Sequence, residues 1–231
     1  MQIKLGMILA AGLGKRMRPI TLTTPKPLIK VGNKNLLERA IEFLISHGVE
    51  QIAINVHHLS TQIKNFIKSK KYKIKIIIFD EQKELLDTGG GILNATKSFD
   101  EPFLAINPDT LWRKDYLNEL KKLEELYFKN KKPCLLLVNK KFSFDKSFGG
   151  DFNLNNNLVS RDSNNELIFT GLQILNSNIF NSTQKKIFSM NEIWDKLIIN
   201  KSLLGIQSHQ KFYHLNTKKM YDKIIDLKII D

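Results

Sequence analysis

Glycines and basic residues gather near the start of the sequence, in the segment Ala10-Ala11-Gly12-Leu13-Gly14-Lys15-Arg16-Met17-Arg18-Pro19. The segment follows an apolar run, which predicts a loop at the end of a buried strand. Small residues allow backbone N–H groups to approach phosphate oxygens, so a nucleotide is the natural ligand. No Gly-Lys-Ser/Thr ends the segment as in a Walker A loop, and Met17 stands where a dinucleotide fingerprint has its third glycine. An ordinary basic turn is the alternative.

A second basic residue with a defined setting is Lys26, in Thr24-Pro25-Lys26-Pro27-Leu28. The two prolines restrict the backbone on either side of Lys26 and hold it extended. A rigid backbone can hold the Lys26 ammonium over a phosphate group. The alternative is a proline turn with a solvated lysine.

The elements that must position these residues follow from the pattern of apolar side chains. Strand-like runs alternate with amphipathic, helix-like stretches. The expected strands cover residues 3–10, 51–56, 74–79, 103–106, 134–138, 168–175 and 211–215. The expected helices cover residues 36–44, 59–67, 116–128, 192–199 and 220–229. This alternation predicts an α/β, Rossmann-like fold of three layers, α/β/α, around a mixed but mainly parallel sheet. Ligands of such sheets bind outside the carboxyl ends of the strands.

Length and composition predict one domain over residues 1–231. A chain of 231 residues with 42% hydrophobic and 26% charged residues can bury a full core. Residues 142–165 are rich in Asn, Ser, Gly and Asp, which is typical of turns and short antiparallel strands, and we expect a small β-rich insertion there. Residues 1–140 then form the nucleotide-binding half and residues 141–231 the second half.

Charge and cysteine usage indicate a cytoplasmic protein that binds neither nucleic acid nor membrane. The formal net charge is +13, but lysines are scattered along the chain, so we expect a basic surface that attracts anionic small molecules. The single cysteine, Cys134, lies in an apolar run and is expected to be a buried thiol. No run approaches the roughly 20 apolar residues that span a bilayer, and the N-terminal apolar run is too short for a secretion signal.

The segment from Leu9 to Pro19 and Pro25-Lys26-Pro27-Leu28, in that order, closely resemble the opening motif of the nucleoside-diphosphate-sugar pyrophosphorylase family, the sugar-1-phosphate nucleotidyltransferases. The resemblance continues through Asp87-Thr88-Gly89-Gly90-Gly91-Ile92, Asn107-Pro108-Asp109, Gly149-Gly150-Asp151-Phe152 and Phe169-Thr170-Gly171. The Thr-Gly-Gly-Gly-Ile run and the Gly-Asp-Phe motif look like the N-acetylmuramate-1-phosphate uridylyltransferase branch. Mannose- and heptose-1-phosphate guanylyltransferases are near relatives.

The resemblance implies that a sugar 1-phosphate attacks the α-phosphorus of an NTP in line, and that pyrophosphate leaves. Arg16, Lys26 and Asp109 are the implied catalytic residues: Arg16 binds the β- and γ-phosphates, and Lys26 neutralises charge between the α-phosphate and the sugar phosphate. The implied nucleotide-binding residues are Leu9, Ala10, Ala11, Gly12, Gly14, Lys15, Gln82, Thr88 and Gly89, the last three reading the base. Asp151, Thr170 and Gly171 are the implied sugar contacts, so the β-rich insertion lies on the sugar side.

The metal site is where the sequence departs from the family. Relatives hold Mg²⁺ on the aspartate of a Gly-Asp dipeptide, and here the dipeptide is Pro108-Asp109. Their late Trp-x-Asp-x-Gly-Thr motif reads Phe212-Tyr213-His214-Leu215-Asn216-Thr217, so His214 replaces the second carboxylate. Imidazole suits softer ions, which makes His214 a doubtful ligand. We expect Mg²⁺ on Asp109, with Mn²⁺ as the alternative ion.

Three functions therefore stay open. The first is an active, metal-dependent transferase that uses an NTP, with UTP favoured, and a muramyl-type sugar 1-phosphate, as a monomer or small homo-oligomer; its alternative form is a mannose- or heptose-1-phosphate guanylyltransferase. The second is a catalytically impaired homologue that binds nucleotide or sugar, which Pro108 and His214 favour. The third, a choline-phosphate cytidylyltransferase, requires an aromatic box for a quaternary ammonium, and the sequence shows no such pattern.

Overall fold

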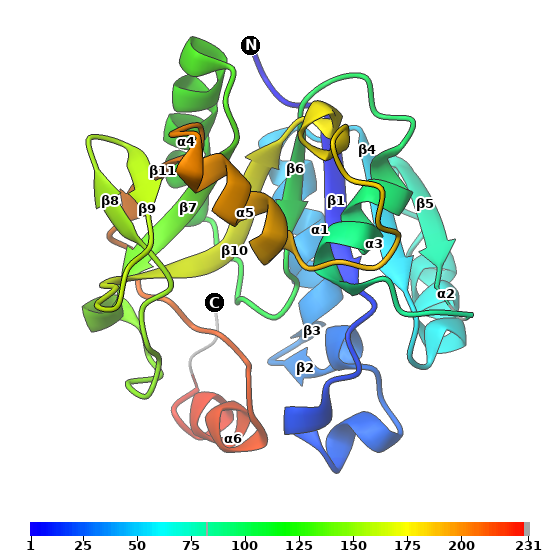
Figure 1. The fold of residues 1–231 in the computed structure, drawn as a ribbon. Coiled ribbons are helices and arrows are strands. Elements are labelled where there is room, and N and C mark those ends of the chain that lie inside the picture. Colours follow the sequence, from blue (N-terminus) through cyan, green and yellow to red (C-terminus); the bar gives the residue numbers. More distant parts are fainter. Residues whose placement is uncertain (82, 229–231) are drawn as a thin grey trace.

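The computed structural model describes residues 1–81 and 83–228 of the chain. Within them, a nine-stranded sheet runs in the order β5-β4-β1-β6-β10-β7-β11-β9-β8 (Figure 1). Its strands are β1 Leu5–Ala10, β4 Gln51–Val56, β5 Lys75–Asp80, β6 Phe103–Ile106, β7 Cys134–Asn139, β8 Asn153–Asn155, β9 Leu158–Ser160, β10 Leu167–Leu175 and β11 Leu204–Ser208. A separate hairpin pairs β2 Lys30–Val31 with β3 Lys34–Asn35.

The sheet is mixed but mainly parallel, which confirms the predicted fold class. β1 lies between β4 and β6 and is parallel to both, with Ile8 opposite Ile54 and Ile106. β10 enters antiparallel between β6 and β7. The carboxyl ends of β1, β4 and β6 consequently meet at one edge, where the loops that follow them can form a site.

Helices cover both faces of the sheet, as the three-layer prediction requires. The helices are α1 Leu36–His47, α2 Ser60–Lys70, α3 Asp87–Thr96, α4 Tyr116–Asn130, α5 Met190–Ile199 and α6 Lys218–Asp226. Apolar side chains of α1, α2 and α4 form one buried cluster with the sheet, and those of α3 and α5 form a second cluster on the other face. Across the described residues, none of these helices is long and apolar enough to cross a membrane.

Local signals explain where α1 begins and ends. The side chain of Asn35 caps the helix by accepting a hydrogen bond from the Glu38 N–H at 2.8 Å. Gly48 ends it with a left-handed backbone, φ 102°. The Leu and Ile residues between these two signals face the core, which is why the sequence predicts this helix well.

Several parts of the predicted fold were wrong or missing. Residues 211–215, predicted as a strand, form only isolated bridges through Phe212 and His214. The strand that pairs with β7 on the side away from β10 is β11, which was not predicted. Helix α3 was also missed, because three consecutive glycines disfavour a helix. Packing requires them: a Cβ on Gly90 would lie 2.3 Å from the carbonyl oxygen of Lys186.

Candidate active site

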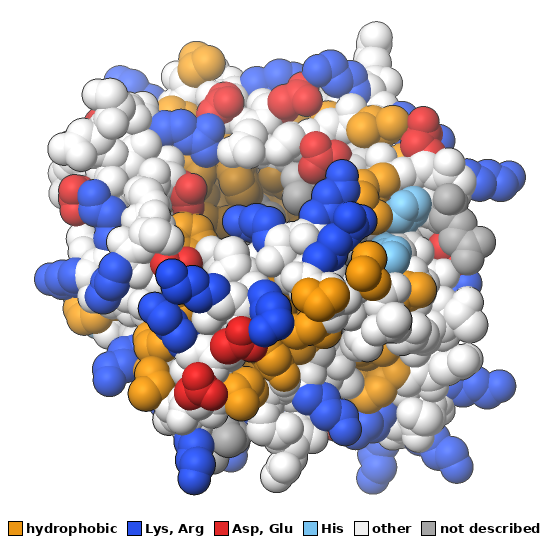
Figure 2. All heavy atoms as spheres, turned by 90° about the horizontal axis from the view of Figure 1, so that it is seen from below, with side chains coloured by type: hydrophobic (Ala, Val, Ile, Leu, Met, Phe, Trp, Pro, Cys, Tyr) orange, Lys and Arg blue, Asp and Glu red, His pale blue; other side chains and the backbone are white. Residues whose placement is uncertain are grey.

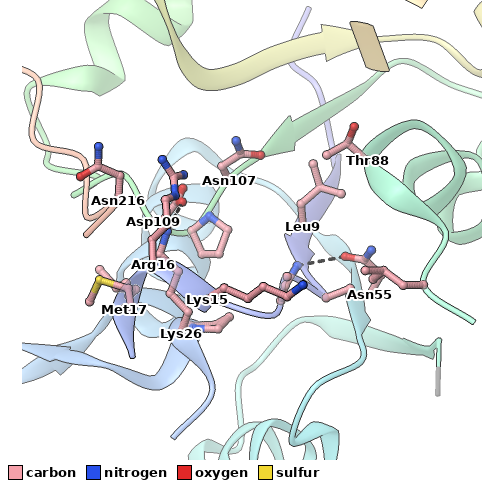
Figure 3. A pocket seen from close by; sticks show the side chains of 18 of the residues that line it. Leu9, Lys15, Arg16, Met17, Lys26, Asn55, Thr88, Asn107, Asp109 and Asn216 are labelled. Atoms are coloured by element: carbon pink, nitrogen blue, oxygen red, sulfur yellow. Dashed lines mark hydrogen bonds and ion pairs between the residues drawn. The ribbon is translucent and has the colours of Figure 1, made fainter. Parts of the chain in front are cut away.

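A cleft of about 350 Å³ opens at the carboxyl ends of β1, β4 and β6. On this face of the molecule, Lys and Arg side chains lie around a hollow (Figure 2). The cleft is lined by ten of the residues implied by the family resemblance, namely Leu9, Ala10, Ala11, Gly12, Gly14, Lys15, Arg16, Lys26, Thr88 and Asp109. The folded chain therefore brings segments that are far apart in sequence to one site (Figure 3).

The predicted phosphate loop turns sharply at Gly14, whose φ is 62°. The Gly14 carbonyl accepts a hydrogen bond from the Thr21 hydroxyl at 2.9 Å, and this bond holds the loop against residues 20–22. Met17 is fully buried among apolar side chains that include Met220 and Ile224 of α6. Burial of Met17 leaves Lys15 and Arg16 exposed at the cleft, where both line the wall. Two cations with this access can bind the phosphates of a nucleotide.

Lys26 and His214 both contact the same carboxylate oxygen of Asp109. The Lys26 ammonium lies 2.5 Å from Asp109 Oδ2, and His214 Nε2 lies 3.0 Å from it. Burial works to raise the pKa of Asp109, but the Lys26 and His214 side chains outweigh it and hold this pKa well below its usual range. Asp109 is thus ionised, and it orients the Lys26 ammonium at the cleft.

The backbone explains how Asp109 and His214 come together. Asp109 follows β6, and its carbonyl accepts a hydrogen bond from the Leu215 N–H at 2.8 Å. Thr110 and His214 form an antiparallel bridge beside it. Backbone hydrogen bonds therefore hold the segment from Phe212 to Thr217 against the residues that follow β6. Pro108 has no N–H to donate, but it does not prevent this arrangement.

A second pocket of about 200 Å³ adjoins the cleft, and Asn107 lines both. All three predicted sugar contacts, Asp151, Thr170 and Gly171, line this pocket together with His214. Five aromatic side chains also line it: Phe148, Phe152, Phe169, Trp194 and Phe212. This aromatic wall was not predicted, because its members come from four separate segments of the sequence.

Hydrogen bonds define what two of the predicted sugar contacts can offer. Asp151 Oδ2 accepts from the Phe169 N–H at 2.9 Å, and burial raises the pKa of Asp151. The Thr170 hydroxyl donates to the Leu136 carbonyl at 2.8 Å, so it forms the wall of the pocket with its proton already engaged. Within the described residues, Oδ2 is the Asp151 carboxylate oxygen that accepts a hydrogen bond, so Oδ1 can accept one from a ligand.

Of the three residues expected to contact the base, the structure places one in the wall of the cleft. Thr88 lines the cleft, and its hydroxyl oxygen accepts from the Met190 N–H at 2.9 Å. Gly89 does not line the cleft, and its N–H donates to the Phe188 carbonyl at 2.9 Å instead of facing a ligand. Gln82 lies outside the described residues.

Several residues of the cleft were not predicted. They include Met17, Pro27, Leu36, Asn55, Leu85, Asp87, Asn107, Pro108 and Asn216. Asn55 had a usable signal, since a polar residue near the end of an otherwise apolar strand calls for a buried partner. Asn216 is held by Asp145, whose Oδ2 accepts from the Asn216 amide at 3.0 Å.

Among the described residues, the candidate metal ligand is the carboxylate of Asp109. They contain no cluster of three or more His, Cys, Asp or Glu side chains that could hold an ion. Asp109 Oδ1 is nevertheless buried and has no hydrogen-bond partner within the described protein, whereas Oδ2 holds Lys26 and His214. A carboxylate oxygen such as Asp109 Oδ1 is a ligand that Mg²⁺ prefers, and a bound nucleotide or water would supply the other ligands.

Comparisons with known proteins identify the family of the chain. Residues 5–148 match the model of the family described as "Nucleotidyl transferase". The chain is 28% identical over 221 residues to the N-acetylmuramate alpha-1-phosphate uridylyltransferase of Caulobacter vibrioides, covering 92% of this chain and 91% of that one. It is 36% identical over 110 residues to the mannose-1-phosphate guanyltransferase of Hypocrea jecorina, but these cover 46% of this chain and 30% of that one.

Solved structures show the same fold. The HddC protein of Yersinia pseudotuberculosis superposes with a TM-score of 0.76 at 24% identity, covering 97% of this chain and 99% of that one. The UDP-glucose pyrophosphorylase of Acinetobacter baumanii gives a TM-score of 0.78 at 17% identity, covering 97% and 92%. With the phosphate loop, Lys26 and Asp109 lining one cleft, and with the family match spanning residues 5–148, the chain belongs to the nucleotidyl transferase family and is a nucleotidyltransferase.

Proposed function

We propose that this chain transfers UMP from UTP to the phosphate of a muramyl-type sugar 1-phosphate, in the cytoplasm, for synthesis of a cell-envelope nucleotide sugar. The observation that carries the proposal is the junction of the two pockets. The cleft and the aromatic pocket share Asn107, and Asp109 of the cleft contacts His214 of the pocket. A nucleotide and a sugar phosphate bound in them would meet beside Lys26.

The chemistry at this junction is a single displacement. A phosphate oxygen of the sugar 1-phosphate forms a bond to the α-phosphorus, and the bond from that phosphorus to the bridging oxygen of pyrophosphate breaks. Both reactants are anions, so catalysis depends on positioning and on cations placed where charge accumulates. Lys26 would stabilise the α-phosphoryl group, while Arg16 and Lys15 would bind the leaving pyrophosphate.

Mg²⁺ is part of the proposal, with Mn²⁺ as the alternative. Asp109 Oδ1 would hold the ion, and oxygens of the triphosphate would complete its coordination. When bound, the ion would neutralise charge on the phosphates. With one protein carboxylate, ion binding should be weak until the nucleotide is present.

The choice of UTP is supported by the similarity to the uridylyltransferase over 92% of the chain. GTP is the second candidate donor, since the guanyltransferase is more similar over a shorter stretch. The aromatic pocket also suits an apolar or cationic part of the acceptor, which keeps a choline-type phosphate in the test.

The test is a panel that pairs each of the four NTPs with a set of sugar 1-phosphates and with phosphocholine, measuring kcat/KM from pyrophosphate release. We expect UTP and a muramyl-type sugar 1-phosphate to give the highest value. A higher kcat/KM with GTP than with UTP would show that guanine is the preferred base. A higher kcat/KM with phosphocholine than with any sugar 1-phosphate would show that the acceptor is a choline phosphate.

A further inference from the structure

A chain of buried hydrogen bonds joins the two walls of the nucleotide cleft. Asn55, at the end of β4, accepts from the Ala10 N–H through Oδ1 at 3.0 Å (Figure 3). Its amide nitrogen donates to Glu81 Oε1 at 2.7 Å. Glu81 Oε2 accepts from the Leu86 N–H at 3.2 Å. Ala10 begins the phosphate loop, and Leu86 lies between two residues of the opposite wall, Leu85 and Asp87.

The pair formed by Asn55 and Glu81 is buried, and its hydrogen bonds determine the orientation of the Asn55 amide. Asn55 is 2% exposed and Glu81 is 4% exposed. A carboxylate only accepts hydrogen bonds and a backbone N–H only donates, so the Asn55 amide can be oriented in one way. An unpaired member would leave a buried polar group without a partner, which is costly. The pair therefore links the two walls through buried hydrogen bonds.

The last glycine of the Thr-Gly-Gly-Gly run provides the space for the pair. A Cβ on Gly91 would lie 2.5 Å from Asn55 Nδ2 and 3.0 Å from Glu81 Oε1. Both distances are shorter than ordinary contacts, so a side chain there would displace the pair. The family resemblance places this run in a motif for the nucleotide, and the structure gives this glycine an indirect part in that task.

We infer that Glu81 is a positioning residue: through Asn55 and Leu86 it fixes the width of the cleft for the nucleoside part of the NTP. Glu81 is absent from the wall of the cleft and acts through its neighbours. The inference rests on the proposed function, because it concerns the same nucleotide site. It predicts that disturbing the pair weakens NTP binding and leaves acceptor binding unchanged.

The test compares two single variants, which each disturb the hydrogen bonds, with a double variant that moves the negative charge from residue 81 to residue 55 and keeps every hydrogen bond. Glu81→Gln offers one oxygen to two donors, the Asn55 amide and the Leu86 N–H, and Asn55→Asp places two carboxylates in contact. In the double variant, the new Asp accepts from the Ala10 N–H and from the Gln amide, and the Gln oxygen accepts from the Leu86 N–H. Every bond of the wild type is then replaced.

The measurement is the Kd of UTP and of GTP by titration without acceptor, followed by the KM for the acceptor. Each single variant should weaken NTP binding on the order of tenfold, and the double variant should recover to within about threefold of wild type. The acceptor KM should stay within about twofold in all of them. Should Glu81→Gln fail to fold, Gly91→Ala displaces the same pair and carries the same expectation.

The matched control is Glu124→Gln. Glu124 of α4 is also buried. It accepts from the N–H of Ile3, ahead of β1, at 2.8 Å and pairs with His47 at 2.8 Å, and it does not line the cleft. Its loss should lower stability but leave the NTP Kd unchanged.

The inference is overturned if Glu81→Gln binds NTP normally, if Glu124→Gln weakens binding equally, if the double variant stays as weak as the single variants, or if the wild type binds no NTP. Binding that follows the predicted order without any product would instead remove only the proposed function.

Discussion

The Lys26 ammonium lies 2.5 Å from Asp109 Oδ2, although 83 positions separate the two residues in sequence. The pair lies where the nucleotide cleft meets the aromatic pocket, and its carboxylate also holds His214. The fold brings the end of β6, which carries Asp109, next to the proline-framed segment that carries Lys26. This contact fixes the Lys26 ammonium where it can act on an α-phosphoryl group.

Lys26→Ala and Asp109→Asn should each lower kcat by at least about a hundredfold, because each removes charge that is needed in the transition state. Lys26→Ala should also lower the melting temperature, since it leaves Asp109 buried with one partner fewer. Steady-state kinetics with thermal unfolding would measure both effects. Lys30→Ala, an exposed lysine nearby in sequence, is the control. Normal kinetics in either active-site variant would refute the assignment.

The fold was largely predictable because its main elements follow local rules. Regular apolar periodicity predicted α1 and α4, and compact apolar runs predicted β4, β6 and β7. The errors fall where distant contacts override local preference. α3 contains glycines that fit against a loop near residue 186. Residues 211–215 form isolated bridges in place of the predicted strand, and β11 pairs with β7.

The site was predictable only where a motif carries it. The phosphate loop and Lys26 lie in one continuous segment, so type and spacing sufficed. Asn55 and Glu81 are single polar residues in or after apolar strands, and their pairing depends on the neighbouring register of β4 and β5. The aromatic pocket draws on several segments, which no sequence window could join.

Arg16→Lys should impair turnover almost as much as Arg16→Ala. Arg16 is exposed at the cleft, where its guanidinium can bind phosphate oxygens with two parallel bonds, and an ammonium cannot do this. Both variants should raise the KM for NTP and lower kcat on the order of tenfold or more. Full activity of the lysine variant would show that Arg16 supplies charge alone, and the role would pass to Lys15 or Arg18.

His214→Asp should make the protein bind Mg²⁺ more tightly. The new carboxylate would face Asp109, and the two like charges repel unless a cation lies between them. Thermal unfolding with and without Mg²⁺ should therefore show a larger stabilisation by the ion in this variant than in wild type. Mg²⁺-dependent activity should rise with it. The double variant with Asp109→Asn should lose the gain, and an unchanged response to Mg²⁺ and Mn²⁺ in His214→Asp would show that position 214 is no ligand site.

Asp145 should make stability depend on acid pH. Burial works to raise its pKa, but hydrogen bonds from Ser147 and Asn216 outweigh burial and lower this pKa. Since the native state holds its proton less tightly than the unfolded state, this stabilisation is present above about pH 3.9 and is lost as pH falls further.

Urea unfolding of wild type and Asp145→Asn measures this effect. The variant should be less stable by about 1 kcal/mol at pH 7, and the difference should shrink below about pH 4. Asp222→Asn, which removes an exposed pair with Lys218, is the control and should cost less than about 0.5 kcal/mol. A difference for Asp145→Asn that is constant with pH would show that the ionisation of Asp145 does not contribute to stability.

Transfer of UMP to the sugar phosphate is tested most directly by following both products of one reaction mixture that contains UTP, a muramyl-type sugar 1-phosphate and Mg²⁺. We expect pyrophosphate and the intact nucleotide sugar to appear in equal amounts, neither to form when the sugar phosphate is omitted, and Asp109→Asn to stop both. Cleavage of the NTP that proceeds without the sugar phosphate, or binding of nucleotide with no product under any pairing of NTP, sugar phosphate and metal, would contradict the proposed transfer.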